Sequence, residues 1–247
     1  MKIKHFLTLP FILCGLFQSN TGFAQAVLIH EGPANQTGIC EPTISVDPTN
    51  TQNVYAASVL NNFYQSTDGG LSWTKESITS PYGVWGDPCL LTDFKGRTYF
   101  FHLSDPEGTN WRSDQILDRM VCQTKDGPED AFNDGSYTAV NGKKHDKEWT
   151  AVNPKNGAIA LSWTQFDQYG TDDPECHSRI LFSESLDQGA HWSTPEEISS
   201  FLGNCVDDDG TAEGAVPAYG TRGEVYVGWA LDQSIWISSK KGKRWET

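Results

Sequence analysis

The chain has 247 residues, of which 37% are hydrophobic and 12% aromatic. This length and composition suffice for a single large all-β domain with a sizeable core. The formal charge of −14 argues against nucleic acid and anionic membranes as partners, because both would repel an acidic protein.

The first 26 residues have the features of an export signal. Two lysines precede an apolar run from Phe6 to Phe17, and Ala24-Gln25-Ala26 offers small residues for cleavage. The run is too short for a membrane span, which needs about 20 residues, and the alternative is a buried first strand or helix. We expect residues 1–26 to be a signal peptide and the mature domain, residues 27–247, to be secreted, periplasmic or at the cell surface without membrane insertion.

Five cysteines remain once the signal is removed, so at least one thiol stays unpaired. Outside the cytosol disulfides form readily, and Cys176 and Cys205, which flank one candidate repeat, are the preferred pair. The sequence contains no Cys-x-x-Cys, so a zinc ribbon or a thioredoxin-like site is not supported.

Four segments share one pattern, starting at Glu41, Asp87, Glu148 and Glu213. Each opens with a carboxylate, continues as a short strand, turns through Pro, Asn or Gly, and returns as a strand rich in Val, Ile, Tyr or Phe. Period-two patterning and turn residues agree on a β-hairpin in each segment.

A third strand follows each hairpin, over residues 61–66, 119–124, 179–184 and 234–239, and a fourth strand is predicted over 74–79 and 193–199. Four antiparallel strands per repeat, at spacings of roughly 45 to 65 residues, are typical of a β-propeller blade. The alternative is an all-β sandwich with coincidental turns.

A turn motif follows the third strand as Ser66-x-Asp68-x-Gly70-x-x-Trp73. Asp68 is expected to accept backbone N–H bonds, Gly70 to adopt a positive φ, and Trp73 to pack on the blade. The motif returns in full at 185–192, in degenerate form from Thr124, and at 238–245 with Lys240 in place of Asp.

This motif resembles the Asp-box, or bacterial neuraminidase repeat, of the sialidase superfamily. The resemblance implies a six-bladed propeller and a secreted exo-α-sialidase, a glycoside hydrolase that removes terminal sialic acid from glycans. Because four units are present and the last ends after its turn, we expect a piece of a longer ring, with residues 26–31 supplying the outer strand of the fourth unit.

The resemblance also implies roles for residues. The family uses a Tyr–Glu pair as nucleophile, an Asp as acid/base and three arginines that grip the substrate carboxylate. Glu213 stands where the family's Glu is expected and Asp87 is the candidate acid. The family's Arg-Ile-Pro motif is absent, with Glu41 near the place of its Arg, and the nucleophilic Tyr would belong to a later blade.

Strand direction brings the carboxylates Glu41, Asp87, Glu148 (with Asp146) and Glu213 to the mouth of the central channel. Converging carboxylates raise each other's pKa, which is how acid/base pairs arise. These four are the candidate catalytic residues. The alternative is that they brace neighbouring blades or together hold a cation.

Two long loops, within residues 102–119 and 163–179, open on the same face and supply Arg112, Arg119 and Arg179. Three guanidinium groups in one pocket would suit a carboxylate ligand, whereas the alternative is salt bridges to an acidic surface.

The second strands end at Ser58 and at three further candidate binding residues, His102, Trp163 and Trp229. The two tryptophans would stack on a sugar ring or else pack between blades, and the histidine is a ligand, a proton carrier or a structural residue.

Residues 205–213 concentrate oxygen ligands, among them Asp207 and Asp209, that suit a structural Ca²⁺ ion, although the spacing is not that of an EF-hand. No cofactor is required. The expected partner is a glycan or glycoconjugate. A non-catalytic carbohydrate- or protein-binding propeller and a glycosidase that uses a carboxylate pair on a neutral glycan are the alternatives. Convergence of the three arginines near Glu213 would favour the sialidase.

Overall fold

The computed structural model describes residues 26–32, 39–138, 140–241 and 244–247, which form four antiparallel sheets of four strands each. Each sheet is built from four consecutive strands, and the predicted all-β propeller with four-stranded blades is confirmed. The predicted signal peptide lies almost wholly outside the described residues. No helix among those described is both long and apolar enough to cross a bilayer.

The strands of the four blades run in chain order across each sheet. They are β1 (Thr43–Val46), β2 (Val54–Ser58), β3 (Asn62–Ser66) and β4 (Thr74–Ser77); β5 (Gly86–Thr92), β6 (Thr98–Leu103), β7 (Met120–Lys125) and β8 (Ser136–Tyr137); β9 (Lys144–Val152), β10 (Ile159–Phe166), β11 (Ser178–Ser185) and β12 (Glu196–Glu197); and β13 (Glu213–Tyr219), β14 (Val225–Leu231), β15 (Ser234–Lys241) and β16 (Arg244–Glu246). One short 3₁₀ turn, Asn110–Arg112, lies in the loop between β6 and β7.

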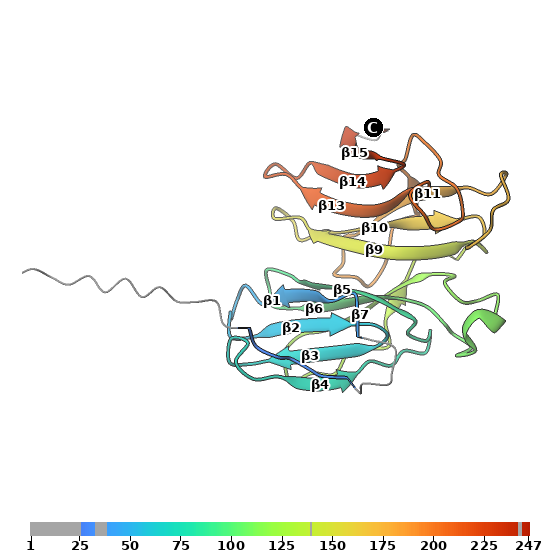
Figure 1. Ribbon diagram of the computed structural model, residues 1–247. Helices are drawn as coiled ribbons and strands as arrows, with labels where there is room; N and C mark the ends of the chain where they lie inside the picture. Colours follow the sequence, from blue (N-terminus) through green and yellow to red (C-terminus); the bar gives the residue numbers. More distant parts are fainter. Residues whose placement is uncertain (1–25, 33–38, 139, 242–243) are drawn as a thin grey trace, which may run out of the picture.

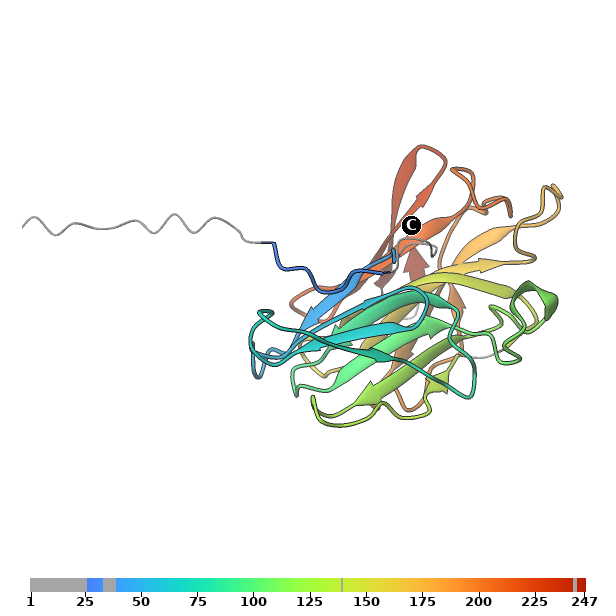
Figure 2. The same ribbon diagram turned by 60° about the horizontal axis from the view of Figure 1, so that its bottom comes forward.

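The innermost strands pack side by side in order, β1 on β5, β5 on β9 and β9 on β13. Figure 1 shows the outer strands of the first blade and those of the fourth at opposite ends of the molecule. The long β6–β7 and β10–β11 loops project on the same side in both views (Figures 1 and 2).

Apolar side chains of alternate strand positions fill the spaces between blades. On β6, Phe100 packs toward the first blade, whereas Tyr99 and Phe101 pack toward the third. Because both faces of such a strand are buried, it is a continuous apolar run in the sequence. Between the third and fourth blades, Phe182 and Val227 belong to one further cluster.

The turn role predicted for Asp68 is confirmed. Its Oδ1 accepts the Ser66 hydroxyl at 2.7 Å and the backbone N–H groups of Leu71 and Ser72 at 3.0 and 2.9 Å. Gly70 has a φ of +90°, as expected. The equivalent bonds recur around Asp187 in the third blade.

The fourth blade differs from the prediction in two ways. It has an outer strand, because β16 pairs with β15 in a tight hairpin that sets Lys241 opposite Arg244. Ser238 therefore lies inside β15, where its hydroxyl donates to the carbonyl of Ile198 at 2.8 Å, and does not begin an Asp-box turn. The segment 26–31 is not a strand of this blade, since the ring of His30 lies 5.7 Å from that of Tyr64 in the first blade.

The predicted disulfide between Cys176 and Cys205 is confirmed, with 5.8 Å between the two Cα atoms. It joins the β10–β11 loop to the segment before β13. Cys40, Cys89 and Cys122 are free thiols, as an odd cysteine count requires for at least one of them.

Candidate active site, a cavity lined by carboxylates

A cavity of about 330 Å³ lies where the inner strands begin. Its lining comes from all four blades and includes five carboxylates, three aromatic side chains and one lysine. The lining residues are Glu41, Trp85, Asp87, Leu103, Trp111, Leu117, Asp146, Lys147, Tyr169, Asp207 and Glu213. The predicted convergence of inner-strand carboxylates at one mouth is therefore observed for Glu41, Asp87 and Glu213.

Strand pairing defines which inner-strand residues are equivalent. Positions 58, 102, 163 and 229 are equivalent in the second strands of the four blades. The residue before each of these positions pairs with an inner-strand residue. In chain order, the four paired inner-strand residues are Thr43, Cys89, Trp149 and Val216. Two residues earlier in each blade stand Glu41, Asp87, Lys147 and Gly214. Lys147, and not Glu148, is thus the equivalent of Asp87.

Those four equivalent residues all adopt a positive φ, of 49°, 51°, 32° and 68° in chain order. Non-glycine residues rarely occupy this region, because it costs roughly 1–2 kcal/mol per residue. The positive φ at Glu41, Asp87 and Lys147 turns these side chains away from the sheet and into the channel. Backbone strain of this kind concentrates at functional sites, which supports the cavity as the candidate site.

The carboxyl groups of Asp87 and Asp146 both line this cavity and are close enough to shift each other's pKa. Burial, and next the charge of Asp87, raises the pKa of Asp146 to about 8. Burial, and next the charge of Glu41, raises the pKa of Asp87 to about 6. Near neutral pH the pair therefore retains one proton, which resides on Asp146.

Lys147 is the one cation among the residues that line the cavity. Its Nζ lies 3.4 Å from Glu41 Oε2 and 5.1 Å from the centre of the Trp149 ring. Burial alone would lower the pKa of Lys147, but the carboxylates of Glu148, Asp87 and Glu41 outweigh it and raise that pKa. The lysine is consequently charged and offsets part of the negative charge beside Asp87.

Glu213 and Asp207 occupy the side of the cavity that the fourth blade and its preceding loop provide. Burial, followed by the charges of Asp207 and its two neighbours, raises the pKa of Glu213. Asp207 Oδ2 accepts the hydroxyl of Tyr169 at 2.5 Å. Burial and this bond raise the pKa of Tyr169, so that its side chain remains a phenol.

Three aromatic side chains form the wall of the cavity. The rings of Trp111 and Tyr169 are stacked, 5.3 Å apart and 21° from parallel, and Trp85 meets Trp111 edge-on at 5.9 Å. Trp111 is 56% exposed, so its ring is accessible to solvent. None of these three was identified from the sequence, although Trp111 and Tyr169 each lie within one of the two long loops on the pocket face.

Glu148 does not belong to the cavity, which corrects the prediction of a catalytic role. Its side chain is fully buried beneath the mouth, and neither carboxyl oxygen has a hydrogen-bond partner among the described residues. Burial raises its pKa well above the usual range. The nearby Asp146, which the sequence analysis named only together with Glu148, lines the cavity instead.

None of the three predicted arginines lines the cavity. Arg119 binds the carboxylate of Asp118 through two bonds of 2.7 Å and lies over the Tyr137 ring. Arg179 Nη1 lies 2.7 Å from Asp167 Oδ1, and Arg112 is exposed on the 3₁₀ turn. The expected convergence near Glu213 is absent, because acidic neighbours on the same loops bind two of the three.

The second-strand candidates are structural. Trp163 and Trp229 are 0% and 1% exposed, and their indole N–H groups donate to His145 Nδ1 and Ser238 Oγ. His102 is fully buried, and burial lowers its pKa to about 4. All three positions face blade interfaces, so none is available to a sugar ring.

The predicted calcium loop is closed by its own hydrogen bonds. The Thr211 hydroxyl accepts the N–H of Asp207 at 3.1 Å, and Asp209 is exposed. Within the described part of the chain, no three His, Cys, Asp or Glu side chains are grouped so as to hold a metal ion. The calcium site stays a prediction without a ligand geometry.

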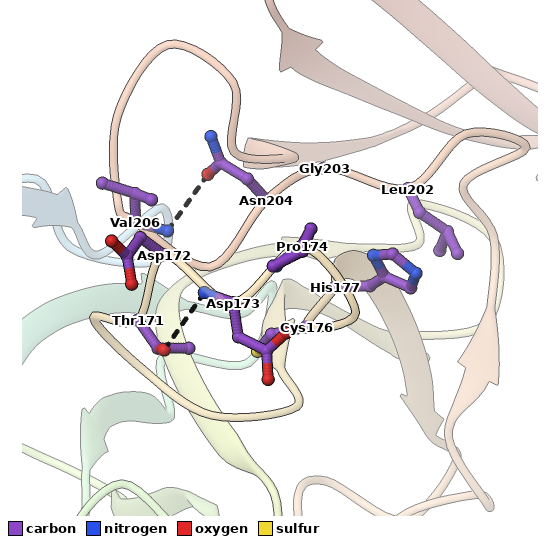
Figure 3. A pocket seen from close by; sticks show the side chains of 10 residues that line it. All are labelled: Thr171, Asp172, Asp173, Pro174, Cys176, His177, Leu202, Gly203, Asn204 and Val206. Carbon is purple, nitrogen blue, oxygen red and sulfur yellow. Dashed lines mark hydrogen bonds between the residues drawn. The ribbon is translucent and has the colours of Figure 1, made fainter.

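A second cavity, of about 380 Å³, lies beside Cys176 of the disulfide (Figure 3). Two of its polar side chains accept backbone N–H groups of their own turns. Asp173 Oδ1 accepts the N–H of Glu175 at 3.0 Å, and Asn204 Oδ1 accepts that of Val206 at 3.1 Å. It has no buried pair of titratable groups, so acid–base chemistry favours the cavity at the inner strands.

Solved structures support the fold. The chain is similar to a protein of unknown function from Dyadobacter fermentans DSM 18053 (14% identity, 86% of this chain and 62% of that one, TM-score 0.59). It is also similar to the Hadza microbial sialidase Hz136 (12% identity, 84% and 45% covered, TM-score 0.58) and to an alpha-L-arabinanase of Penicillium chrysogenum complexed with arabinobiose (14% identity, 84% and 62% covered, TM-score 0.54). This chain thus spans less than two thirds of each of these proteins.

No protein-family model and no curated protein matches the sequence. The fold and the cavity together define the class: an all-β protein of propeller blades whose inner strands present carboxylates to one aromatic-walled cavity.

Proposed function

We propose that this protein is a glycoside hydrolase whose proton donor is Asp146, supported by Asp87, and whose second carboxylate is Glu213. The observation that carries the proposal is the pair of neighbouring carboxyl groups, Asp87 and Asp146, which line an aromatic-walled cavity and keep a proton near neutral pH. A carboxyl group with a raised pKa is what general acid catalysis requires at that pH.

Glycoside hydrolysis ordinarily uses two carboxyl groups about 5–9.5 Å apart, on either side of the scissile bond. Asp87 and Asp146 are close enough to shift each other's pKa, and we assign them together to the acid role. Glu213 belongs to another blade and lines the same cavity, so it is the candidate for the second role.

In the proposed reaction the proton of Asp146 passes to the glycosidic oxygen as the bond from that oxygen to the anomeric carbon breaks. The Glu213 carboxylate faces the positive charge that develops on the sugar. Water adds to the anomeric carbon and gives up one proton to a carboxylate of the cavity. One glycoside and one water yield a hemiacetal and an alcohol, and the cavity regains the proton it supplied.

Proteins of similar fold support a carbohydrate substrate. Beside the sialidase and the arabinanase, they include an ulvan lyase of polysaccharide lyase family PL25 and an N-acetylgalactosamine deacetylase from F. plautii in complex with blood group B trisaccharide. We infer a glycan or glycoconjugate as the partner of this chain. The disulfide Cys176–Cys205 supports action outside the cytosol, where such bonds persist.

Exo-α-sialidase activity is the more specific form of this hypothesis. It needs a cationic site for the substrate carboxylate, and the cavity offers Lys147, already engaged with Glu41. The ionised carboxylates of the lining outnumber its one lysine and disfavour an anionic sugar electrostatically. We therefore propose glycosides of sugars without an acidic group as the preferred substrates, and sialosides remain in the test as the alternative substrate.

A panel of fluorogenic glycosides, neutral, amino-substituted and sialylated, tests the proposal. We expect hydrolysis of at least one non-acidic glycoside, with kcat/KM lower by about 10²–10⁴ in Asp146→Asn and unchanged in Glu129→Gln, an exposed acid outside the cavity lining. Cleavage of sialosides alone would replace the non-acidic substrate class with the sialidase hypothesis.

A non-catalytic glycan-binding protein is the second candidate, because the exposed Trp111–Tyr169 stack can hold a sugar ring without any chemistry. Binding that depends on Trp111, with no hydrolysis of any glycoside by the wild-type protein, would favour this candidate over the enzyme.

A further inference from the structure

The two sides of the cavity differ in how their carboxylates are neutralised. On one side Asp146 holds a proton and Glu41 has the ammonium of Lys147 at 3.4 Å. On the other side, Asp207 and Glu213 have no cation within salt-bridge distance among the described residues. Two acids that face one cavity without a counter-charge would attract a positive group on a ligand.

Two residues of the aromatic wall, Tyr169 and Trp111, lie on that same side. Tyr169 donates its hydroxyl to Asp207 at 2.5 Å, and its ring is stacked on that of the exposed Trp111. Carboxylates next to aromatic faces attract ammonium groups by charge and by cation–π interaction. A neutral sugar would use only the aromatic face, and a sugar acid would be repelled by the carboxylates.

The protein itself places ammonium groups in such surroundings. Lys147 lies between the Glu41 carboxylate and the Trp149 ring, at 3.4 and 5.1 Å. The Lys125 Nζ lies 4.8 Å from the Phe63 ring centre and 2.6 Å from the side-chain oxygen of Gln65. Contact of an ammonium with an oxygen and an aromatic ring is therefore a geometry that this fold uses repeatedly.

We propose that the sugar bound in this cavity is an amino sugar, whose protonated amine lies between Asp207 and Glu213 while its ring stacks on Trp111. This inference rests on the proposed function and narrows its substrate class. A divalent metal is the competing cation, but no three metal-ligating side chains are grouped within the ranges described, whereas three aromatic side chains line the cavity.

Calorimetric titration of the metal-free protein at about pH 6, where an alkyl amine is protonated, tests the inference. The probes are oligosaccharides of glucosamine and of galactosamine, their N-acetylated counterparts of equal length, and a uronic acid oligosaccharide. We expect at least one amine form to bind about tenfold or more tightly than its N-acetyl form, and this preference to shrink at high salt.

Two substitutions distinguish the contact of Asp207 with the amine from the stacking of the sugar ring on Trp111. Asp207→Asn should remove most of the amine preference, to below about threefold, with less effect on the N-acetyl form. Trp111→Ala should weaken both forms by a similar factor, because stacking does not detect the amine. The controls are Glu129→Gln and Tyr226→Ala, an exposed acid and an exposed aromatic residue outside the cavity lining, which should retain the preference.

Equal binding of amine and N-acetyl forms, preference for the uronic acid, or displacement of the amine sugar by Ca²⁺ at stoichiometric concentration would overturn the inference. The hydrolysis panel is scored separately. Hydrolysis of glycosides without an amine preference leaves the proposed function intact and refutes only the ligand class. An amine preference without hydrolysis supports the ligand class and refutes the enzyme.

Discussion

Asp146 and Glu148 lie two residues apart on β9, yet only Asp146 lines the cavity. In a regular strand both side chains would point to the same face. The positive φ of Lys147 interrupts this alternation, turning Asp146 and Lys147 to the cavity and leaving Glu148 buried beneath it. One backbone angle therefore decides which acid is available for chemistry.

Paired substitutions test this difference. We expect Asp146→Asn to lower kcat/KM for glycoside hydrolysis by about 10²–10⁴, because the proton donor is lost. Glu148→Gln should stay within about threefold of wild type, since Glu148 does not line the cavity. Steady-state kinetics on one glycoside provides both values. An equal loss in the two variants would contradict the positions assigned to them.

The pKa values of the acid pair predict how stability depends on pH. Asp146 and Asp87, with pKa values of about 8 and about 6, bind more protons in the folded state than in the unfolded chain between about pH 4 and pH 8. Stability therefore falls as pH rises through this window.

Asp146→Asn removes one of these groups and should raise the Tm relative to wild type by at least about 2 °C at about pH 8. The gain should decline toward pH 4, where the wild-type carboxyl is protonated in both states. Thermal unfolding of both proteins across this range measures the difference. A gain that is constant with pH would show that Asp146 is not a buried acid, and Glu129→Gln is the matched exposed control.

At the scale of the element, the β10–β11 loop and the loop before β13 together hold Tyr169 and Asp207 in place. The disulfide Cys176–Cys205 joins the two loops, and the N–H of Gly170 donates to the Cys205 carbonyl at 2.8 Å. The aromatic wall therefore depends on a covalent link outside the cavity.

Replacing Cys176 and Cys205 together with serine should lower the free energy of unfolding by about 3–4 kcal/mol, because the disulfide closes a loop of 29 residues. The looser wall should raise KM more than it lowers kcat. Urea unfolding and kinetics measure the two effects, with Cys40→Ser, the exposed free thiol, as control. An unchanged KM in the double variant would show that the disulfide does not hold the substrate-binding residues in place.

Most strands were predictable because their signals are local. The apolar run on β6 and the turn at Ser66–Trp73 each contain the residues that determine them. The fourth blade was not, because Ser238, Gly242 and Trp245 keep the spacing of the turn motif while β15 continues to Lys241. The pairing of β15 with β16 is therefore compatible with the residue spacing of an Asp-box turn.

The site was predictable only in part. Convergence of the inner strands follows from blade topology, which correctly located Glu41, Asp87 and Glu213. The register shift at Lys147 arises from a backbone conformation without a sequence signature. Trp111 and Tyr169 lie in loops that carry no periodicity, and Arg119 is engaged by the adjacent Asp118, a pairing that spacing alone does not reveal.

For the whole molecule, stability comes from the spaces between blades, and the two faces of one blade can differ. On the fourth blade Val227 is fully buried against the third, whereas Ile235 and Ile237 are 78% and 60% exposed on the other face. Figure 2 shows this blade at the margin of the molecule.

Val227→Thr should cost about 1–3 kcal/mol in the free energy of unfolding, since it buries a hydroxyl between blades. Ile237→Thr should change it by no more than about 0.5 kcal/mol. Chemical denaturation of the two variants compares them directly. A large loss for Ile237→Thr would show that this face is packed in solution.

The role of Asp146 as proton donor is tested most directly by varying the leaving group of the glycoside. A dinitrophenyl leaving group departs without a proton, whereas an alkyl leaving group requires one. We predict that Asp146→Asn loses about 10²-fold or more in kcat/KM on the alkyl glycoside and less than about tenfold on the dinitrophenyl glycoside, while Glu213→Gln loses activity on both. Equal losses on the two glycosides in Asp146→Asn would contradict the assignment of Asp146 as the acid.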